Sequence, residues 1–588
     1  MATDRPALLG LAREELATGH AARSRALCAE LLAAAPDDPE GLHLLAVLDL
    51  SQGRAADALA PIERALAGDA LDPKKHQTHG LVLRAHGRRS EAARAFREAL
   101  RLSAEFPEPH GSLASILMEE GEFAEAARHF ERALQGRPAV YAWHLGLGLA
   151  RSHLDDPAAA ADAFRRATEL DPRAPEAHNN LGTALLSAGD LPRAEASLRR
   201  CIALAPAHSH AWTNLGNALR RSGRAREAEE AYRRATQGEP PLPIAWVNLG
   251  NALKDADRFG EAMEAYARAE ATSPALAEVH LSRAIACLAT GDLERGWDEY
   301  RWRFGAPPDP AVRERLREAV RAGNPIEVQG EQGLGDVLFF LRWASALRAQ
   351  GAKLSFRGDP RLFPLLARSG AFHRFLGVEP RVEGALALPS GDLPWATHGL
   401  TGPHPPAFPL EASGEALDAA GRLLGAAGPP PYVGVAWRAG LPLQGSAEHL
   451  HKMVPLEALG EALRSVPGTI VSLQRNANAE ETAALAKHAG RPVADAGAVN
   501  ADLDAILGLL ARLDEYAGVS STNVHLRAGL GLGARVLVPV PPEWRYGRTG
   551  ATSPWFAGFT LYREGRERGW TPALDTLAAD LQREHGQR

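Results

Sequence analysis

Two short polar segments follow apolar runs and contain the residue types that hold a phosphate or move a proton. The first is Gln329-Gly-Glu-Gln-Gly-Leu-Gly-Asp336, between a predicted strand and a predicted helix. Gly333 and Gly335 allow a tight turn and a close approach of a ligand to the backbone. Free amide groups at the helix start favour the Asp336 charge, so this carboxylate is either a helix cap or a base beside a ligand.

The second segment runs from Val519 to Gly531, where a strand is predicted to end and a helix to begin. Ser521, Thr522 and Asn523 add hydroxyl and amide groups to the unpaired amides of a helix start, which suits a phosphate. We expect His525, one turn further on, to face the same site. The alternative is a polar helix cap followed by a core histidine, and the density of polar groups favours ligand binding.

Basic side chains follow the strand that begins the last part of the chain. Arg438, in Trp437-Arg438, and Lys452, in His451-Lys452, both stand on a predicted irregular loop. Such cations neutralise a nucleotide phosphate. The alternative is a pair of solvated loop residues. Arg475, which follows another strand, belongs to the same class with a weaker signal.

Several other chemistries do not fit the pattern. The glycine spacing in Gln329–Asp336 is not the dinucleotide fingerprint, and no Walker lysine follows, which argues against a dehydrogenase or an ATPase. Asp502-Leu-Asp504 opens a predicted helix and therefore reads as a cap. His449 and His451 stand two apart without further ligands, so zinc is not expected.

The sequence also lacks the nucleophile elbow of a hydrolase. No convincing carboxylate cluster is available to hold a cation beside the ligand. We therefore expect no metal and no cofactor, and a metal-independent reaction.

Short β-rich runs alternate with helical ones after residue 324, which predicts parallel sheets of the doubly wound type. The predicted strands are Ile326–Gln329, Leu354–Phe356, Tyr432–Trp437, Thr469–Leu473, Tyr516–Val519 and Arg535–Val540. Proline-rich segments at Pro403–Pro409 and Gly428–Pro431 divide this region. We expect two Rossmann-like halves, 325–428 and 429–588. Ligands collect at the carboxyl ends of parallel strands, so the two polar segments should form opposite walls of one cleft.

A period of 34 residues dominates the chain before residue 305. Small residues recur at Ala58, Ala92, Ala126, Ala160, Ala194, Ala228 and Ala262, and a larger, mostly aromatic residue follows four positions later. A turn residue precedes each alanine by five positions, usually glycine, with Asp155 and Asp257 as substitutes. This is the tetratricopeptide pattern of stacked helix pairs. We expect a superhelix of about nine units over 1–304, followed by a linker at 305–324.

Asparagines also recur at this period, at Asn180, Asn214 and Asn248. An amide offers donors and an acceptor, so a ladder of them can clamp an extended peptide backbone. The alternative, given equal weight, is that they are consensus residues that satisfy contacts between neighbouring helices.

Composition narrows the class of protein. The net charge of −6 argues against a general nucleic-acid binder. Cys28, Cys201 and Cys287 are far apart and odd in number, so neither a disulfide framework nor a metal knuckle is expected. The sequence has no basic stretch leading into an apolar run at its start and no membrane-length apolar stretch, which predicts a cytoplasmic protein without a membrane span.

The C-terminal region resembles the bacterial GT-B glycosyltransferases related to lipopolysaccharide heptosyltransferases. Glu331–Asp336 looks like their N-terminal loop, whose aspartate is the base. Ser520–His525, with Leu526 and Gly529, looks like their donor-phosphate motif, and Lys452 stands at the place of their phosphate-binding lysine.

The whole chain is similar to bacterial fusions of tetratricopeptide repeats with a glycosyltransferase. Some of these modify flagellin with nonulosonic acids. The runs Pro541–Arg545 and Ser553–Phe556 also look like that group. Ser521 departs from the heptosyltransferase motif, which has an aspartate there. This departure puts a heptose donor in doubt and is compatible with a more anionic donor, because a repulsive carboxylate is lost. The asparagine ladder resembles that of the nucleocytoplasmic O-linked N-acetylglucosamine transferases, where such residues hold the acceptor protein.

These resemblances imply a protein O-glycosyltransferase. A nucleotide-activated sugar would be transferred to serine or threonine of an acceptor, such as flagellin, held by the repeats. Asp336 would be the base. The donor would be bound by Gly333, Gly335, Arg438, Lys452, Ser521, Thr522, Asn523 and His525. The alternative is a protein-binding scaffold with a catalytically decayed transferase domain.

Overall fold

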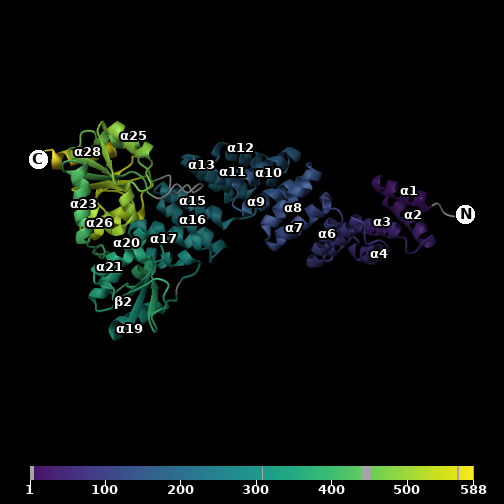
Figure 1. Ribbon diagram of the computed structural model, residues 1–588, viewed down its shortest axis with the longest axis horizontal. Coiled ribbons are helices and arrows are strands. Elements are labelled where there is room, and N and C mark those ends of the chain that lie inside the picture. Colours follow the sequence, from purple (N-terminus) through teal and green to yellow (C-terminus); the bar gives the residue numbers. More distant parts are fainter. Residues whose placement is uncertain (1–4, 308, 440–451, 566–568, 587–588) are drawn as a thin grey trace. The chain divides into compact units, whose positions relative to one another are not determined.

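The computed structural model describes residues 5–307, 309–439, 452–565 and 569–586. The chain forms two compact units. The N-terminal unit comprises residues 1–227 with 238–240, and the C-terminal unit comprises residues 228–237 with 241–588. Figure 1 follows the chain by colour from the helical repeats to the strand-containing region.

Consecutive antiparallel helices form nine pairs in the described residues. The helices of the repeats are α1 (Arg5–Ala17), α2 (Ala21–Ala34), α3 (Pro39–Ser51), α4 (Ala55–Gly68), α5 (Pro73–Ala85), α6 (Arg89–Leu102), α7 (Pro107–Glu120), α8 (Phe123–Gly136), α9 (Tyr141–His153), α10 (Pro157–Leu170), α11 (Pro175–Ser187), α12 (Leu191–Leu204), α13 (Ser209–Arg221), α14 (Ala225–Ala235), α15 (Pro243–Asp255), α16 (Phe259–Thr272), α17 (Ala277–Thr290) and α18 (Leu293–Tyr300). The helical repeats predicted from the period of 34 residues are confirmed.

The repeated small residues and aromatics form the contact between the two helices of a pair. Ala160 is completely buried and Phe164 nearly so. The first helix contributes a glycine sixteen residues before the aromatic: a Cβ on Gly148 would lie 2.5 Å from the Phe164 ring, and one on Gly250 would lie 2.4 Å from Tyr266. At these two positions, glycine allows the aromatic ring to lie directly against the first helix.

Asp155 and Asp257 stand where other repeats have a turn glycine. Both adopt positive φ angles, 55° and 62°, in the region that Gly53 and Gly121 occupy at 71° and 82°. Aspartate tolerates this left-handed conformation better than most residues. The prediction that these two residues replace glycine in the turns is confirmed.

The C-terminal unit contains two parallel sheets. One has the strand order β3-β2-β1-β4, and the other has the order β10-β9-β8-β5-β6-β7. The strands are β1 (Pro325–Gln329), β2 (Lys353–Arg357), β3 (Arg374–Leu376), β4 (Leu386–Pro389), β5 (Tyr432–Ala436), β6 (Thr469–Ser472), β7 (Val493–Asp495), β8 (Glu515–Val519), β9 (Arg535–Val538) and β10 (Thr560–Arg563). All six predicted strands occur, each within two residues of its predicted ends.

Helices connect these strands and cover the sheets. The α-helices of this region are α19 (Val312–Ala322), α20 (Leu334–Ala349), α21 (Phe363–Arg368), α22 (Leu393–Ala396), α23 (Gly414–Ala427), α24 (Leu456–Leu463), α25 (Ala479–Ala489), α26 (Leu503–Arg512), α27 (Thr522–Gly529) and α28 (Thr571–His585). Short 3-10 helices are η1 (Arg301–Phe304), η2 (Pro360–Leu362), η3 (Ser390–Asp392), η5 (Gly497–Ala501) and η6 (Trp544–Tyr546). The architecture is that of an α/β region, as predicted.

The last repeats and the α/β region share one hydrophobic core within the C-terminal unit. Trp297 of α18 packs edge-on against Trp343, Trp544 and Trp555, with ring centroids 5.6, 5.4 and 6.1 Å away. One cluster of buried side chains extends from Leu288 of α17 to the residues of both sheets. The predicted domain boundaries stay predictions. In the described residues, no helix has the length and apolar character needed to cross a membrane.

Candidate functional site

The two polar segments singled out in the sequence meet in the C-terminal unit. One follows β1 and opens α20, and the other follows β8 and opens α27. A Cβ on Gly335 would lie 3.0 Å from the His525 ring and 3.5 Å from the Cα of Thr522. A side chain at position 335 would therefore push the two helix starts apart, which explains the glycine.

Asp336 is the third residue of α20 and is not its cap residue, because Gly333 occupies that position. Its Oδ1 lies 2.5 Å from Nη2 of Arg545, and its side chain is 37% exposed. The carboxylate is therefore anchored by a cation from the segment after β9 while it remains reachable from solvent.

Lys452 lies in the same charged network. Its Nζ is 2.6 Å from Oε1 of Glu543. The other Glu543 oxygen accepts a hydrogen bond from the Ser520 hydroxyl at 3.2 Å and lies 3.6 Å from Nη1 of Arg545. Glu543 and Arg545 thus connect Asp336, Lys452 and the Ser520–Asn523 segment.

Arg545 is held among aromatic rings as well as carboxylates. Its guanidinium carbon lies 4.6 Å from the Phe339 ring centroid and 4.7 Å from that of Trp544. Asp336 and Glu543 outweigh the cost of burial and raise the pKa of Arg545 above its usual value. This side chain is therefore a permanent, preorganised cation.

A cavity of about 290 Å³ lies beside the start of α27. Its polar lining combines three guanidinium groups with amides and hydroxyls: Arg361, Arg438, Arg475, Gln474, Asn476, Asn500, Ser521, Thr522 and Asn523. Leu334, Leu473, Leu503 and Ile506 form part of its apolar lining. This combination suits an anionic ligand with a planar or apolar part. The cavity brings four predicted donor-binding residues together, and Asp336, Gly333, Gly335 and Lys452 lie outside its lining.

Arg438 is held by an ion pair that involves only part of its guanidinium group. Its Nε and Nη2 donate to the Glu481 carboxylate at 3.0 and 2.9 Å. Its buried Nη1 has no hydrogen-bond partner among the described residues. A buried donor without a partner is costly unless a ligand or water satisfies it.

His525 does not face the cavity, contrary to the expectation from the sequence. It is buried, and its ring packs edge-on against Phe339 and Phe556 at 6.1 and 5.4 Å. Burial first, and then the nearby Arg545 and Arg342 charges, hold its pKa well below the usual value. The histidine is therefore neutral and packs between α20 and α27, as in the core-histidine alternative.

The Asp502-Leu-Asp504 prediction is confirmed. Oδ1 of Asp502 accepts the backbone N–H groups of Asp504 and Ala505 at 2.8 and 3.1 Å, which caps α26. His449 and His451 lie outside the described residues.

The asparagine ladder also makes contacts between repeats. The Asn214 amide donates to Oδ1 of Asn179 at 3.2 Å and to the Thr183 hydroxyl at 2.9 Å. The same position, 35 residues apart, pairs His43 with Thr78 and Gln77 with Ser112. Asn214 therefore satisfies contacts between neighbouring helices, as the consensus-residue alternative predicts. Within the described part of the chain, these two bonds use both amide hydrogens of Asn214, and its carbonyl oxygen remains to accept from a bound peptide.

Asn180 and Asn248 lie elsewhere in the ladder. Asn180 lines a hollow of about 220 Å³ together with Leu149, Ser152, Phe164 and Thr183. Asn248 is half-buried in α15. Leu149 is 38% exposed, so the hollow offers both apolar surface and an amide to a ligand.

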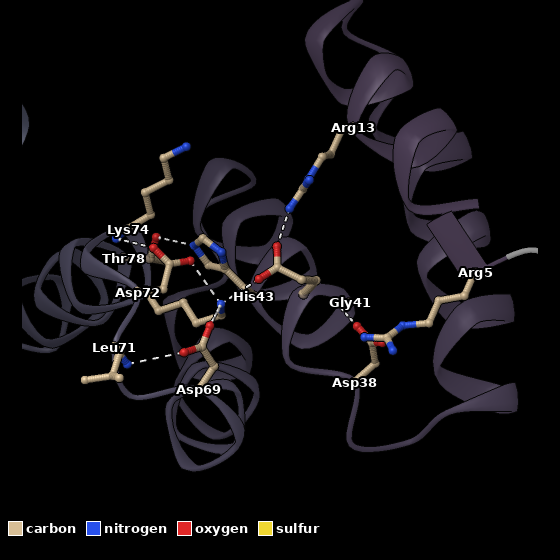
Figure 2. A network of polar contacts seen from close by, with 12 residues as sticks. Arg5, Arg13, Asp38, Gly41, His43, Asp69, Leu71, Asp72, Lys74 and Thr78 are labelled. Atoms are coloured by element: carbon tan, nitrogen blue, oxygen red, sulfur yellow. Dashed lines mark hydrogen bonds and ion pairs between the residues drawn. The ribbon is translucent and has the colours of Figure 1, made fainter. Parts of the chain in front are cut away.

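A second polar network stabilises the first repeats (Figure 2). The Lys75 side chain is completely buried, and its Nζ contacts Glu40, Asp69 and Asp72 at 2.6, 2.8 and 3.0 Å. The three carboxylates are close enough together to hold a cation, and the ammonium fills that place. This cluster therefore joins α3 to α5 and the turn before it.

The end of the last repeat holds the Gln329–Asp336 segment. Arg303 of η1 is 2.6 Å from Glu331 and 2.6 Å from Asp392. The Tyr300 hydroxyl and the Gln332 amide hydrogen-bond at 2.9 Å. In the segment after β9, Arg548 pairs with Asp257 at 3.3 Å. The last repeats thus contact the Gln329–Asp336 segment and the segment after β9 that contains Glu543 and Arg545.

Sequence reasoning missed Glu543 and Arg545 as site residues. Both belong to Pro541–Arg545, which was noted only as a resemblance. The available signal was their place directly after β9, because charged residues at the carboxyl end of a parallel strand lie where ligands bind.

The comparisons with known proteins identify the repeats. A tetratricopeptide-repeat family model matches residues 9–74, 78–139, 112–175, 145–209, 179–243 and 213–277. Protein FlbA of Caulobacter vibrioides is 27% identical over 335 residues, which cover 52% of this chain. The match spans 55% of FlbA's own length.

Several solved structures of repeat proteins are similar to part of the chain. The tetratricopeptide protein YrrB is 21% identical, with 31% of this chain and 95% of YrrB covered and a TM-score of 0.30. MamA from Desulfovibrio magneticus RS-1 is 19% identical, with 29% and 96% covered and a TM-score of 0.27. A repeat protein from Cytophaga hutchinsonii is 18% identical, with 41% and 99% covered and a TM-score of 0.32. The family model and the nine helix pairs show that the N-terminal half of the chain is a solenoid of tetratricopeptide repeats, the kind of scaffold that binds proteins. An α/β region with two parallel sheets follows it.

Proposed function

We propose that this chain is a protein O-glycosyltransferase of the GT-B type. The repeats hold an acceptor protein, and the α/β region transfers a sugar from a nucleotide-activated donor to serine or threonine. One observation carries the proposal: the starts of α20 and α27, which follow strands of different sheets, meet beside a cavity with three guanidinium groups. Facing strand ends with an anion-binding wall are what a nucleotide-sugar site requires.

The donor nucleotide occupies the cavity of Arg438, Ser521, Thr522 and Asn523 in this proposal. The Nη1 of Arg438, which has no partner among the described residues, and the amides at the start of α27 bind its phosphates. The apolar side chains of the lining cover the base. Lys452 binds the phosphate that leaves with the nucleotide.

Asp336 acts as the general base. The acceptor hydroxyl oxygen attacks the anomeric carbon, the bond from that carbon to the donor phosphate oxygen breaks, and the hydroxyl proton passes to Asp336. The negative charge ends on the phosphate, where Lys452 and the α27 amides stabilise it. Arg545 positions the carboxylate through the 2.5 Å contact.

The acceptor is a protein segment bound along the repeats. The remaining acceptor atom of Asn214 and the hollow beside Asn180 support this role. Flagellin is the first acceptor to test, because it is the substrate of fusions that the chain resembles. Replacement of Asn180, Asn214 and Asn248 together by alanine should weaken acceptor binding and leave nucleotide binding unchanged.

Separate measurements of binding and chemistry test these roles. Asp336→Asn should keep nucleotide affinity and slow single-turnover transfer by ~10²–10⁴-fold. Lys452→Ala and Thr522→Ala should weaken nucleotide binding. Asp418→Asn, on the exposed surface of α23, is the matched control and should change neither. Full transfer activity of Asp336→Asn would contradict the assignment of Asp336 as the general base.

A protein-binding scaffold without transfer is the second candidate. The observation in its favour is that Asp336 and Lys452, the two central groups of the proposed chemistry, are both engaged in ion pairs within the chain. A scaffold would bind its partner and show neither nucleotide binding nor sugar transfer.

A further inference from the structure

The Glu543 carboxylate occupies a position that is built for an anion. Lys452 Nζ lies 2.6 Å from one of its oxygens, and the Ser520 hydroxyl donates to the other at 3.2 Å. Nη1 of Arg545 is 3.6 Å from the same second oxygen. Two cations and a hydroxyl therefore converge on one carboxylate, and a phosphate oxygen would be recognised by the same set.

The charges of this network balance without a ligand. Asp336 and Glu543 contribute two negative charges, and Arg545 and Lys452 contribute two positive charges. Burial opposes ionisation of Glu543, but Lys452 and Arg545 outweigh it and keep its pKa below the usual value. A phosphate that approached Lys452 would meet an ionised carboxylate already in its place.

Contacts with the last repeats hold the backbone around Glu543 in place. Trp544 packs against Trp297 with ring centroids 5.4 Å apart, and Arg548 pairs with Asp257 at 3.3 Å. Trp544, between Glu543 and Arg545, and Arg548, three residues beyond Arg545, are thus anchored to the last repeats. The displacement inferred below therefore requires movement of the Glu543 side chain and not of the segment that carries it.

We propose that Lys452, Ser520 and Arg545 form an anion subsite that Glu543 fills until a phosphate of the donor displaces its carboxylate. This inference rests on the proposed function for the identity of the anion. Glu543 is then a competitor built into the chain: it lowers the affinity for every phosphate ligand and prevents Lys452 from holding unrelated anions. The alternative is a purely structural ion pair that positions Lys452.

Calorimetry of inorganic pyrophosphate binding to the full chain distinguishes a displaceable Glu543 carboxylate from a purely structural ion pair. Glu543→Gln removes the competing charge and should bind pyrophosphate about tenfold more tightly than the wild type, because the subsite no longer has to be vacated. Lys452→Ala should lose most of the affinity. The double variant should lose the gain, which would show that the gain acts through Lys452.

Two controls make the result specific. Glu461→Gln, on the exposed surface of α24, changes the net charge equally and should leave the affinity unchanged. Glu543→Asp keeps the charge on a shorter side chain and should fall between the wild type and Glu543→Gln. Thermal melts establish that each variant is folded.

Unchanged or weaker pyrophosphate binding by Glu543→Gln would overturn the inference and make Glu543 a positioning residue. Failure of both the wild type and Glu543→Gln to bind pyrophosphate would overturn the inference as well. The proposed function is tested separately by sugar transfer. Tighter pyrophosphate binding by Glu543→Gln, with no sugar transfer by the wild type, would support the anion subsite and contradict the proposed transferase activity.

Discussion

Replacement of Arg303 by leucine should destabilise the C-terminal unit strongly and in a pH-dependent way. Arg303 is 6% exposed and is shared between Glu331 and Asp392, which are 11% and 5% exposed. Glu331 keeps one further donor, the Gly391 backbone N–H at 2.9 Å. The substitution therefore leaves two buried carboxylates with little compensation.

The size of the effect follows from the cost of an unpaired buried charge. Removal of one partner from a buried ion pair costs about 3–5 kcal/mol in the free energy of unfolding. Burial already raises the pKa of both Glu331 and Asp392, and Arg303 opposes that rise. Without Arg303 both pKa values rise further above those of the unfolded chain. The two acids are then ionised in the unfolded state and protonated in the folded state over a wider range, so stability falls as pH rises.

Urea denaturation followed by tryptophan fluorescence measures this effect. The loss should be close to the full ~3–5 kcal/mol at pH 8 and clearly smaller at pH 5. Arg295→Leu, at an exposed position of α18, is the matched control and should stay within ~0.5 kcal/mol of the wild type. A loss below ~1 kcal/mol at pH 8, or a loss that does not shrink at pH 5, would refute the assignment of Arg303 as the anchor of the Gln329–Asp336 segment.

Three further perturbations test other parts of the structure. Lys75→Met should cost about 3 kcal/mol and expose the amides of α3 and α5 to hydrogen exchange, because three partly exposed carboxylates lose their common partner, whereas Lys74→Met should not. A buried neutral histidine makes the protein less stable as pH falls through the pKa of the unfolded state. His525→Asn should therefore flatten the pH dependence of the free energy of unfolding below pH ~6.5 by up to about 1.4 kcal/mol per pH unit. An unchanged slope would contradict the assignment of His525 as neutral. Asn214→Ala should lower the melting temperature as well as acceptor affinity, because its amide joins two repeats, and loss of affinity with an unchanged melt would contradict this double role.

The repeats were predictable because the same sequence pattern occurs in nine successive units. A small residue, an aromatic and a turn residue at fixed spacing leave few alternatives, and even the two aspartates in turn positions could be recognised. The glycines that face Phe96, Phe164 and Tyr266 were not recognised, although each lies sixteen residues before its aromatic. Their role depends on how two helices cross, and a single helix pattern does not contain that information.

Strands were predictable where they are central and apolar. β3, β4, β7 and β10 were missed; they have three or four residues and include charged or proline residues such as Arg374, Pro389 and Asp495. Edge strands of this length do not show a run of apolar side chains.

The candidate site was predicted in its parts but not in its connections. The positions of Asp336 and Thr522 at strand-to-helix junctions followed from local pattern. The contact between Asp336 and Arg545 joins residues 209 positions apart, and many arginines in the chain could serve equally by sequence alone. The orientation of His525 depended on which face of α27 meets α20, and the density of neighbouring polar residues gave the wrong indication.

The mass of an acceptor protein tests the central claim most directly. Purified full chain, a nucleotide-activated sugar and candidate acceptors, flagellin first, should be incubated together and the acceptor weighed by intact mass spectrometry. The account predicts a mass increase of one sugar residue or more on serine or threonine with the wild type, and almost none in the same time with Asp336→Asn. An acceptor that binds the repeats yet keeps its mass with every nucleotide sugar would contradict it and leave a protein-binding scaffold.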